Sequence, residues 1–125
     1  MIYQAQVLRV DGDIEEEVML RVAGIELTCF ASVCPYKIET GLSYPVELRL
    51  VMFDDYAITE LPDETPSSVA RVGTSFAYVV TGKLNDSCLE SGSLFFEDEV
   101  LQRDFSYLEG KMIAIKVDRM DVEFL

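Results

Sequence analysis

Residues 18–33 constrain the fold of this chain more than any other segment, because hydrophobic and polar residues alternate there on both sides of a glycine. Hydrophobic side chains fall on one face over residues 18–22 and again over residues 25–33. A repeat of two residues is typical of β-strands that bury a single face. Ala23 and Gly24 separate the two runs, and glycine adopts the positive φ that tight hairpin turns need. The sequence therefore predicts a β-hairpin and an antiparallel sheet to which it belongs.

The same strand-like character recurs along most of the chain and predicts a mostly β protein of about six or seven strands. A chain of 125 residues, half of them hydrophobic, is typical of one folded domain with a substantial core. We therefore expect residues 1–125 to form a single β-rich domain. Besides the hairpin, the segments that we predict as strands are residues 2–10, 46–53, 75–84, 93–97 and 111–125.

Two other segments favour helical structure. One carries a stripe of hydrophobic residues with helical spacing and then a glycine that would end the helix: Leu101, Phe105, Leu108 and Gly110. The other begins at Thr65-Pro66, where proline suits the first helical position, and predicts a helical turn over residues 67–72. The surrounding stretch 54–74 is polar and has no period of two, which indicates a long, functional or mobile loop.

The last strand-like segment changes its hydrophobic pattern near residue 118. Ile113, Ile115 and Val117 share one parity, whereas the hydrophobic residues after Asp118 occupy the other. A shift of one residue moves every following side chain to the opposite face of a strand. The interpretation that we favour is a β-bulge at residues 118–119 that bends one long strand around a curved sheet. The alternative is that the strand ends at Asp118 and a separate segment follows.

The C-terminal part of the chain combines a short helix, a glycine and then an alternating strand. This order, carried by FSYLEGKMIAIKV within residues 75–125, resembles that of oligonucleotide/oligosaccharide-binding (OB) barrels. The resemblance lies in the order of elements and assigns no functional residue. The fold class that we predict is therefore all-β, or β-rich α+β: a small curved antiparallel sheet or an OB-like barrel with one or two short helices.

Acidic residues outnumber basic ones by 23 to 10, which gives a formal net charge of −13. Such a charge repels phosphate backbones and attracts cations, so we expect a basic protein partner and disfavour direct nucleic-acid binding. The same charge also promotes solubility without any partner, and that alternative stays open. The first ten residues lack a basic leader and no apolar run is long enough to cross a bilayer, which indicates a cytoplasmic protein without membrane contact.

Five acidic side chains crowd into residues 11–17. An EF-hand calcium loop needs glycine at its sixth position and glutamate at its twelfth, whereas here Gly12 comes second and Val22 stands twelfth. Asp11-Gly12 is instead a strong signal for a hairpin turn between two alternating runs. The glutamates that follow would then lie in solvent at the start of a strand. Further acidic groups occur over residues 54–64 and 97–99.

The reactive side chains argue against an enzyme. The chain has no histidine, which excludes Ser-His-Asp and Cys-His nucleophilic systems and histidine-containing zinc sites. Its three cysteines form no C-x-x-C pair and suit a reducing compartment, and the Gly-Lys of VTGK lacks the rest of a phosphate-binding loop. Paired carboxylates can hydrolyse glycosides, but the sequence has no tryptophan on which a sugar would stack. We expect no cofactor and no metal site.

The function that we predict is an acidic protein-binding module, such as a small cytosolic inhibitor or immunity-type protein that meets a basic partner. The alternative is an OB-like domain that binds nucleic acid or another small ligand, or a subunit of a larger complex. Two acidic groups and one aromatic anchor are the predicted partner contacts: Asp11, Asp13, Glu15, Glu16, Glu17, Asp54, Asp55, Tyr56, Glu60, Asp63 and Glu64.

Overall fold

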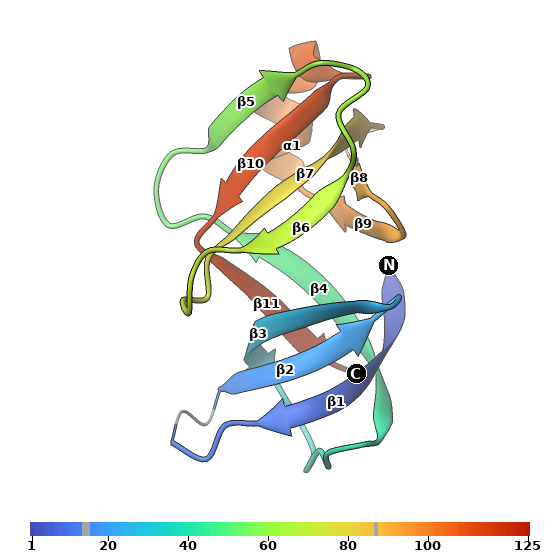
Figure 1. Ribbon diagram of the computed structural model, residues 1–125, viewed down its shortest axis with the longest axis vertical. Helices are drawn as coiled ribbons and strands as arrows, with labels where there is room; N and C mark the ends of the chain where they lie inside the picture. The colour runs from blue at the N-terminus through green and yellow to red at the C-terminus, as the bar shows by residue number, and fades with distance from the viewer. Residues whose placement is uncertain (14–15, 87) are drawn as a thin grey trace.

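The computed structural model describes residues 1–13, 16–86 and 88–125, which form two β-sheets and one short helix. The first sheet lies at the lower end of Figure 1 and consists of β1 (Ile2–Val10), β2 (Glu17–Val22), β3 (Ile25–Val33), β4 (Ser43–Val51) and β11 (Arg119–Phe124). The second lies at the upper end and consists of β5 (Ala57–Leu61), β6 (Ser68–Arg71), β7 (Tyr78–Asn85), β8 (Cys88–Ser91), β9 (Leu94–Glu97) and β10 (Met112–Val117).

The strands of the first sheet run in a closed ring, in the order β1-β2-β3-β11-β4. β11 pairs in parallel with β3 on one side and antiparallel with β4 on the other, and β4 pairs back onto β1. The second sheet is open and has the order β5-β10-β7-β8-β9, with β6 also paired to β7. Every strand of the ring therefore has a neighbour on both sides, whereas the second sheet has free edges.

The predicted all-β class is confirmed, but the described residues hold eleven strands rather than six or seven. Three of the additional strands are short and lie outside the segments that we predicted as strands, over residues 57–61, 68–71 and 88–91, and the fourth arises because residues 111–125 form two strands, β10 and β11. Four or five residues are too few to establish an alternating pattern, and polar side chains are tolerated where a strand faces solvent. β5 forms because its backbone pairs with β10, far along the chain, whereas β6 and β8 pair with the strands that adjoin them in sequence.

The hairpin predicted around Ala23 and Gly24 is confirmed. β2 and β3 pair antiparallel up to Val22 opposite Ile25, so only these two residues form the turn. Ala23 has φ of 50° and Gly24 has φ of 79°, the left-handed conformation required by the tight turn. The faces also follow the sequence pattern, since Val18, Leu20 and Val22 are all buried.

The short helix predicted from residues 101–108 is also confirmed, in two pieces. Helix α1 (Glu99–Asp104) and the 3₁₀ turn η1 (Ser106–Leu108) meet at Phe105, and Leu101 and Leu108 are buried. The helical turn predicted over residues 67–72 is wrong, because β6 occupies most of this stretch and pairs with β7. No helix within the described ranges has the length and apolar character needed to cross a membrane.

The chain crosses between the sheets twice, once from β4 to β5 and once from β10 to β11 (Figure 1). The predicted bulge is therefore wrong: β10 ends at Val117, and after the single residue Asp118 the chain enters the other sheet. The hydrophobic parity changes because the two strands bury their side chains in different sheets. Asp118 also joins the crossings, since its N–H donates to the Val51 carbonyl at 3.0 Å and its carboxylate accepts from the Phe53 N–H at 2.8 Å.

Two tyrosine hydroxyls join the sheets away from these crossings. The hydroxyl of Tyr78 on β7 accepts a hydrogen bond from the Thr28 N–H of β3 at 2.6 Å. The hydroxyl of Tyr3 on β1 accepts one from the Phe95 N–H of β9 at 2.7 Å. Buried amides need such partners, because an unsatisfied donor destabilises the folded state. One hydrophobic cluster contains side chains from both sheets, so the core is continuous between them.

A buried ion pair lies on β11. Asp121 is 2% exposed and accepts from Arg119 at 2.6 Å and 3.2 Å, through both carboxylate oxygens. The guanidinium carbon of Arg119 lies 4.1 Å from the ring centre of Phe30 and 5.3 Å from that of Phe53. The paired hydrogen bonds compensate for the burial of the Asp121 carboxylate. This contact joins β11 to β3 and to the first crossing.

Gly82 on β7 provides a direct test of how closely β7 and β8 pack in the second sheet. A Cβ atom at this position would overlap the Glu90 carbonyl of β8 and lie 3.2 Å from the Ser91 Cα. Because backbone atoms cannot move aside as a side chain can, we expect Gly82→Ala to lower the free energy of unfolding by about 2 kcal/mol or more. Denaturant-induced unfolding, followed by circular dichroism, measures the change.

The matched control is Gly12→Ala. An added Cβ at Gly12 has no neighbour within 4 Å, and its φ is not in the left-handed region. We expect this substitution to leave the unfolding midpoint almost unchanged. Equal midpoints for the two variants would contradict the close packing of β7 against β8.

Candidate functional site

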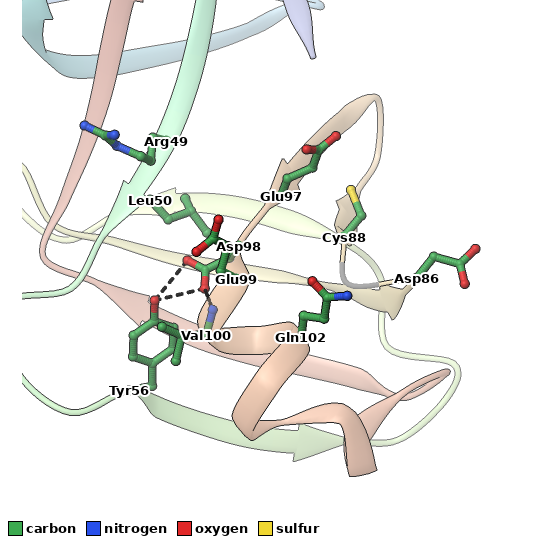
Figure 2. Close-up of a pocket in the computed structure, with 10 residues that line it drawn as sticks. All are labelled: Arg49, Leu50, Tyr56, Asp86, Cys88, Glu97, Asp98, Glu99, Val100 and Gln102. Carbon is green, nitrogen blue, oxygen red and sulfur yellow. Dashed lines mark hydrogen bonds between the residues drawn. The ribbon is translucent and has the colours of Figure 1, made fainter.

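A cleft lies where the two sheets meet, between β4 on one side and β8, β9 and α1 on the other (Figure 2). Its main hollow has a volume of about 850 Å³ and is lined by Arg49, Leu50, Tyr56, Asp86, Cys88, Glu97, Asp98, Glu99, Val100 and Gln102. A smaller hollow of about 200 Å³ shares Arg49 and Glu97 and is also lined by Met1, Glu47, Leu48, Phe95 and Glu123. We call the two hollows together the inter-sheet cleft.

Carboxylates dominate the inter-sheet cleft. Six line it, and they come from β4, β7, β9, α1, β11 or their ends: Glu47, Asp86, Glu97, Asp98, Glu99 and Glu123. Arg49 is the one cationic side chain among the described lining residues; it is 61% exposed and lies 3.9 Å from Asp121. A concave surface with this excess of anions concentrates negative potential and favours a cationic ligand.

Asp98 has a structural role within this group. Its carboxylate caps α1 by accepting from the N–H groups of Val100 at 2.9 Å and Leu101 at 3.1 Å. It also accepts from the Tyr56 hydroxyl at 2.9 Å and 3.0 Å, as Figure 2 shows, and the Tyr56 ring stacks on Phe105. Asp98 is therefore already bonded, and this contact ties the start of β5 to the start of α1.

Three other carboxylates of the cleft are available to a ligand. Asp86, Glu97 and Glu99 are exposed, and none of them forms an ion pair among the described residues. Glu97 and Glu99 flank Asp98 in sequence, and both line the cleft (Figure 2). Leu50 and Val100 add apolar surface next to these charges, which suits the aliphatic part of a lysine or arginine side chain.

Cys88 does not have the properties of a reactive thiol. Burial raises the pKa of this thiol, and the negative charges of Glu90 and Glu97 raise it further. Only the thiolate is a good nucleophile, so these surroundings keep the sulfur in its less reactive form. Within the described residues, no group of three or more cysteine, aspartate or glutamate side chains is arranged to hold a metal ion.

The first predicted acidic group lies far from the inter-sheet cleft, on the connection from β1 to β2 at the lower end of Figure 1. Glu15 lies outside the described residues. Asp13 and Glu16 are exposed, and the Asp13 N–H donates to the Asp11 carboxylate at 2.8 Å. Glu17 is different, because it lies 3.9 Å from Arg71 and 4.0 Å from Arg9, and a hydrogen bond with Asp11 raises its pKa.

The second predicted group lies on β5 of the second sheet and on the segments at both ends of this strand. Asp54 and Asp55 precede the strand, Glu60 lies within it and residues 63–64 follow it, and all five carboxylates are exposed. Of the predicted contacts that the structure describes, Tyr56 alone lines the cleft. The connection from β5 to β6, residues 62–67, lies at the upper end of Figure 1, at the other end of the molecule from the β1–β2 connection. The structure therefore separates the two predicted groups instead of bringing them onto one face.

The lining residues that the sequence analysis missed come from separate parts of the chain. Arg49 and Glu47 belong to an ordinary alternating strand, and Asp86 to a connection, so no local pattern distinguishes them. The Glu97–Glu99 triplet was visible as an acidic run without a neighbouring base. That run indicated negative charge but could not place it beside β4, because β4 and the end of β9 come together only through the crossing of the chain between the sheets.

Tyr56 and Asp98 provide a test of the cleft geometry. Burial, together with the hydrogen bond to Asp98 and the charge of this carboxylate, raises the pKa of Tyr56 far above its ordinary value. Asp98→Asn removes the charge but keeps an oxygen that caps α1. We expect the pKa of Tyr56 to fall toward the ordinary tyrosine range in this variant, as measured by the ultraviolet absorbance of phenolate during alkaline titration.

The sign of the pH dependence follows from the same contact. The folded state holds the Tyr56 proton more tightly than the unfolded chain does, so its contribution to stability falls once the pH rises above the ordinary tyrosine pKa. In Asp98→Asn this loss should be smaller. Glu97→Gln removes a neighbouring charge that does not bond to Tyr56, and serves as control. A Tyr56 titration that is the same in all three proteins would contradict the assigned cause.

A comparison with curated proteins found no significant match. One family model matches residues 1–125, so the match includes both sheets and the inter-sheet cleft. The chain therefore belongs to the family of this model, whose description reads "Uncharacterised conserved protein UCP019853".

Proposed function

We propose that this protein is an acidic protein-binding module whose inter-sheet cleft receives a basic segment of a partner protein. The observation that carries the proposal is the charge of the cleft, where six carboxylates accompany a single arginine. Charge complementarity of this kind speeds association and selects the partner more than it adds affinity. The partner segment would present lysine or arginine side chains to Asp86, Glu97 and Glu99.

The character of the partner follows from the lining. An anionic substrate or a phosphate backbone would be repelled, because it would meet the same carboxylates. With no histidine in the sequence and a protonated Cys88, the cleft offers surface for binding rather than groups for catalysis. A small cytoplasmic inhibitor or immunity-type protein, which covers the cationic surface of a nuclease or toxin, fits these features best.

The second candidate is an OB-like domain that binds nucleic acid or another small ligand. The closed ring of five strands favours it, because OB-folds are five-stranded Greek-key barrels. Phe53 is 64% exposed beside Arg119, which is a combination that single-stranded nucleic acids use for stacking. However, Asp121 already neutralises Arg119. The charge of the molecule therefore favours the protein-binding function.

The cleft can be tested with octalysine as a probe and a triple variant, Asp86→Asn, Glu97→Gln and Glu99→Gln. An exposed ion pair changes affinity roughly two- to threefold, so we expect the triple variant to bind octalysine roughly tenfold more weakly at low salt. Isothermal titration calorimetry measures the affinity, and repetition at higher salt should reduce the difference between the proteins.

The control has the same change in net charge on the far connections of the first sheet: Asp13→Asn, Glu16→Gln and Glu39→Gln. These side chains are exposed, and the described residues hold no ion-pair partner for them. We expect this variant to lose no more than about twofold in affinity. Equal losses in the two triple variants would mean that net charge alone attracts the probe. A larger loss in the control would favour the β1–β2 connection as the contact.

A further inference from the structure

β5 is an edge strand. Its pairing with β10 runs from Leu61 opposite Met112 to Ala57 opposite Lys116, and the sheet order places no strand on its other side. In an antiparallel strand alternate residues direct their N–H and C=O groups away from the paired neighbour. Among the described residues, no other backbone hydrogen bond reaches residues 57–61. The outer edge of β5 therefore presents backbone groups that a further strand could bind.

The other edge strands of the second sheet, β6 and β9, have more of their backbone groups bonded or covered. β9 lies against β4, and the N–H of Phe95 is bonded to the Tyr3 hydroxyl. On β6, the Ser68 carbonyl accepts from the Ser91 hydroxyl. By contrast, Ala57, Thr59 and Glu60 of β5 are exposed. β5 has no lysine, proline or bulge within its five residues, so only its short length, Glu60 and the Pro62 that follows it limit pairing along this edge.

The charge around β5 indicates what would cover this edge. Asp54, Asp55, Glu60, Asp63 and Glu64 lie on the strand or next to it, and no lysine or arginine occurs between residues 50 and 70. None of the five carboxylates forms an ion pair among the described residues. Two copies of this chain would bring these carboxylates together if they paired edge to edge. The charge therefore opposes self-association and favours a cationic strand.

We infer that the outer edge of β5 is a second interaction surface, which binds an extended segment of a partner protein rich in lysine or arginine by β-strand addition. In this mode backbone hydrogen bonds provide affinity, and side chains provide specificity. The surface is separate from the inter-sheet cleft and relies on the proposed function only for the sign of the partner's charge. The added strand would bond to the outward backbone groups of Ile58 and Glu60, because Ala57, Thr59 and Leu61 direct theirs toward β10, and its cations would lie near the flanking carboxylates.

The test uses an eight-residue peptide of alternating lysine and valine. Its control is the same peptide with N-methyl groups on two consecutive central residues, which block both edges of the peptide and leave its charge unchanged. Amide hydrogen exchange is followed by NMR. We expect the unmodified peptide to slow exchange at the outward amides of residues 57–61 about tenfold, and the methylated peptide to leave them unchanged.

A second triple variant distinguishes binding at the β5 edge from binding in the cleft. Glu60→Gln, Asp63→Asn and Glu64→Gln together should weaken the protection of β5 by the peptide several-fold. The triple variant of the cleft described above, with Asp86, Glu97 and Glu99 neutralised, should preserve that protection. Loss of protection at β5 in the cleft variant would overturn the inference that the edge binds independently. Three other results would also overturn it. These are equal protection by both peptides, protection confined to residues around the cleft, and a dimer that pairs through β5 without peptide. Protection confined to the cleft would leave the proposed function standing. Protection confined to β5 would contradict binding of a basic segment in the inter-sheet cleft and would support strand addition at β5.

Discussion

The position of β11 is the constraint on which the rest of the structure depends. This strand lies between β3 and β4 and closes the ring of the first sheet, yet the chain reaches it only after the whole second sheet. The ring can close only if Asp118 returns the chain from the second sheet to the gap between β3 and β4. Because Asp118 is also bonded to Val51 and Phe53, both crossings are held in one place. The two sheets therefore stabilise each other, although each has its own strand order.

The inter-sheet cleft is a consequence of this arrangement. β4 leaves the ring beside β9, so the end of β9 and the start of α1 face Arg49 and Leu50 across the junction. The hydrogen bonds from Tyr56 to Asp98 hold the start of α1 against the start of β5, and Glu97 and Glu99 on either side of Asp98 are exposed to solvent. Repulsion between neighbouring carboxylates destabilises a fold, and a cationic partner would remove part of that repulsion. The same physical argument applies to the edge of β5, since no lysine or arginine occurs between residues 50 and 70.

The sequence predicted the parts of the fold that local patterns determine. The turn at Ala23-Gly24 and the helix over Leu101 follow from backbone conformation and spacing within a few residues. The strand β5 could not be predicted because its partner β10 is remote in sequence, and β6 and β8 could not because four residues are too few to show a period of two. The parity change at Asp118 was detected, but its cause is a passage between sheets, which no local pattern distinguishes from a bulge. For the same reason the acidic groups were recognised, whereas their separation and the inter-sheet cleft were not.

The late position of β11 also affects synthesis. β3 and β4 leave the ribosome before every residue of the second sheet, and at roughly 5–20 residues per second the remaining stretch takes several seconds to appear. During that interval both strands have one unpaired side, and Met120 and Val122 of β11 have not yet joined the hydrophobic core. The nascent chain is thus exposed to wrong strand pairing at this stage. Its dense negative charge, which keeps neighbouring nascent chains apart, is suited to reducing that hazard.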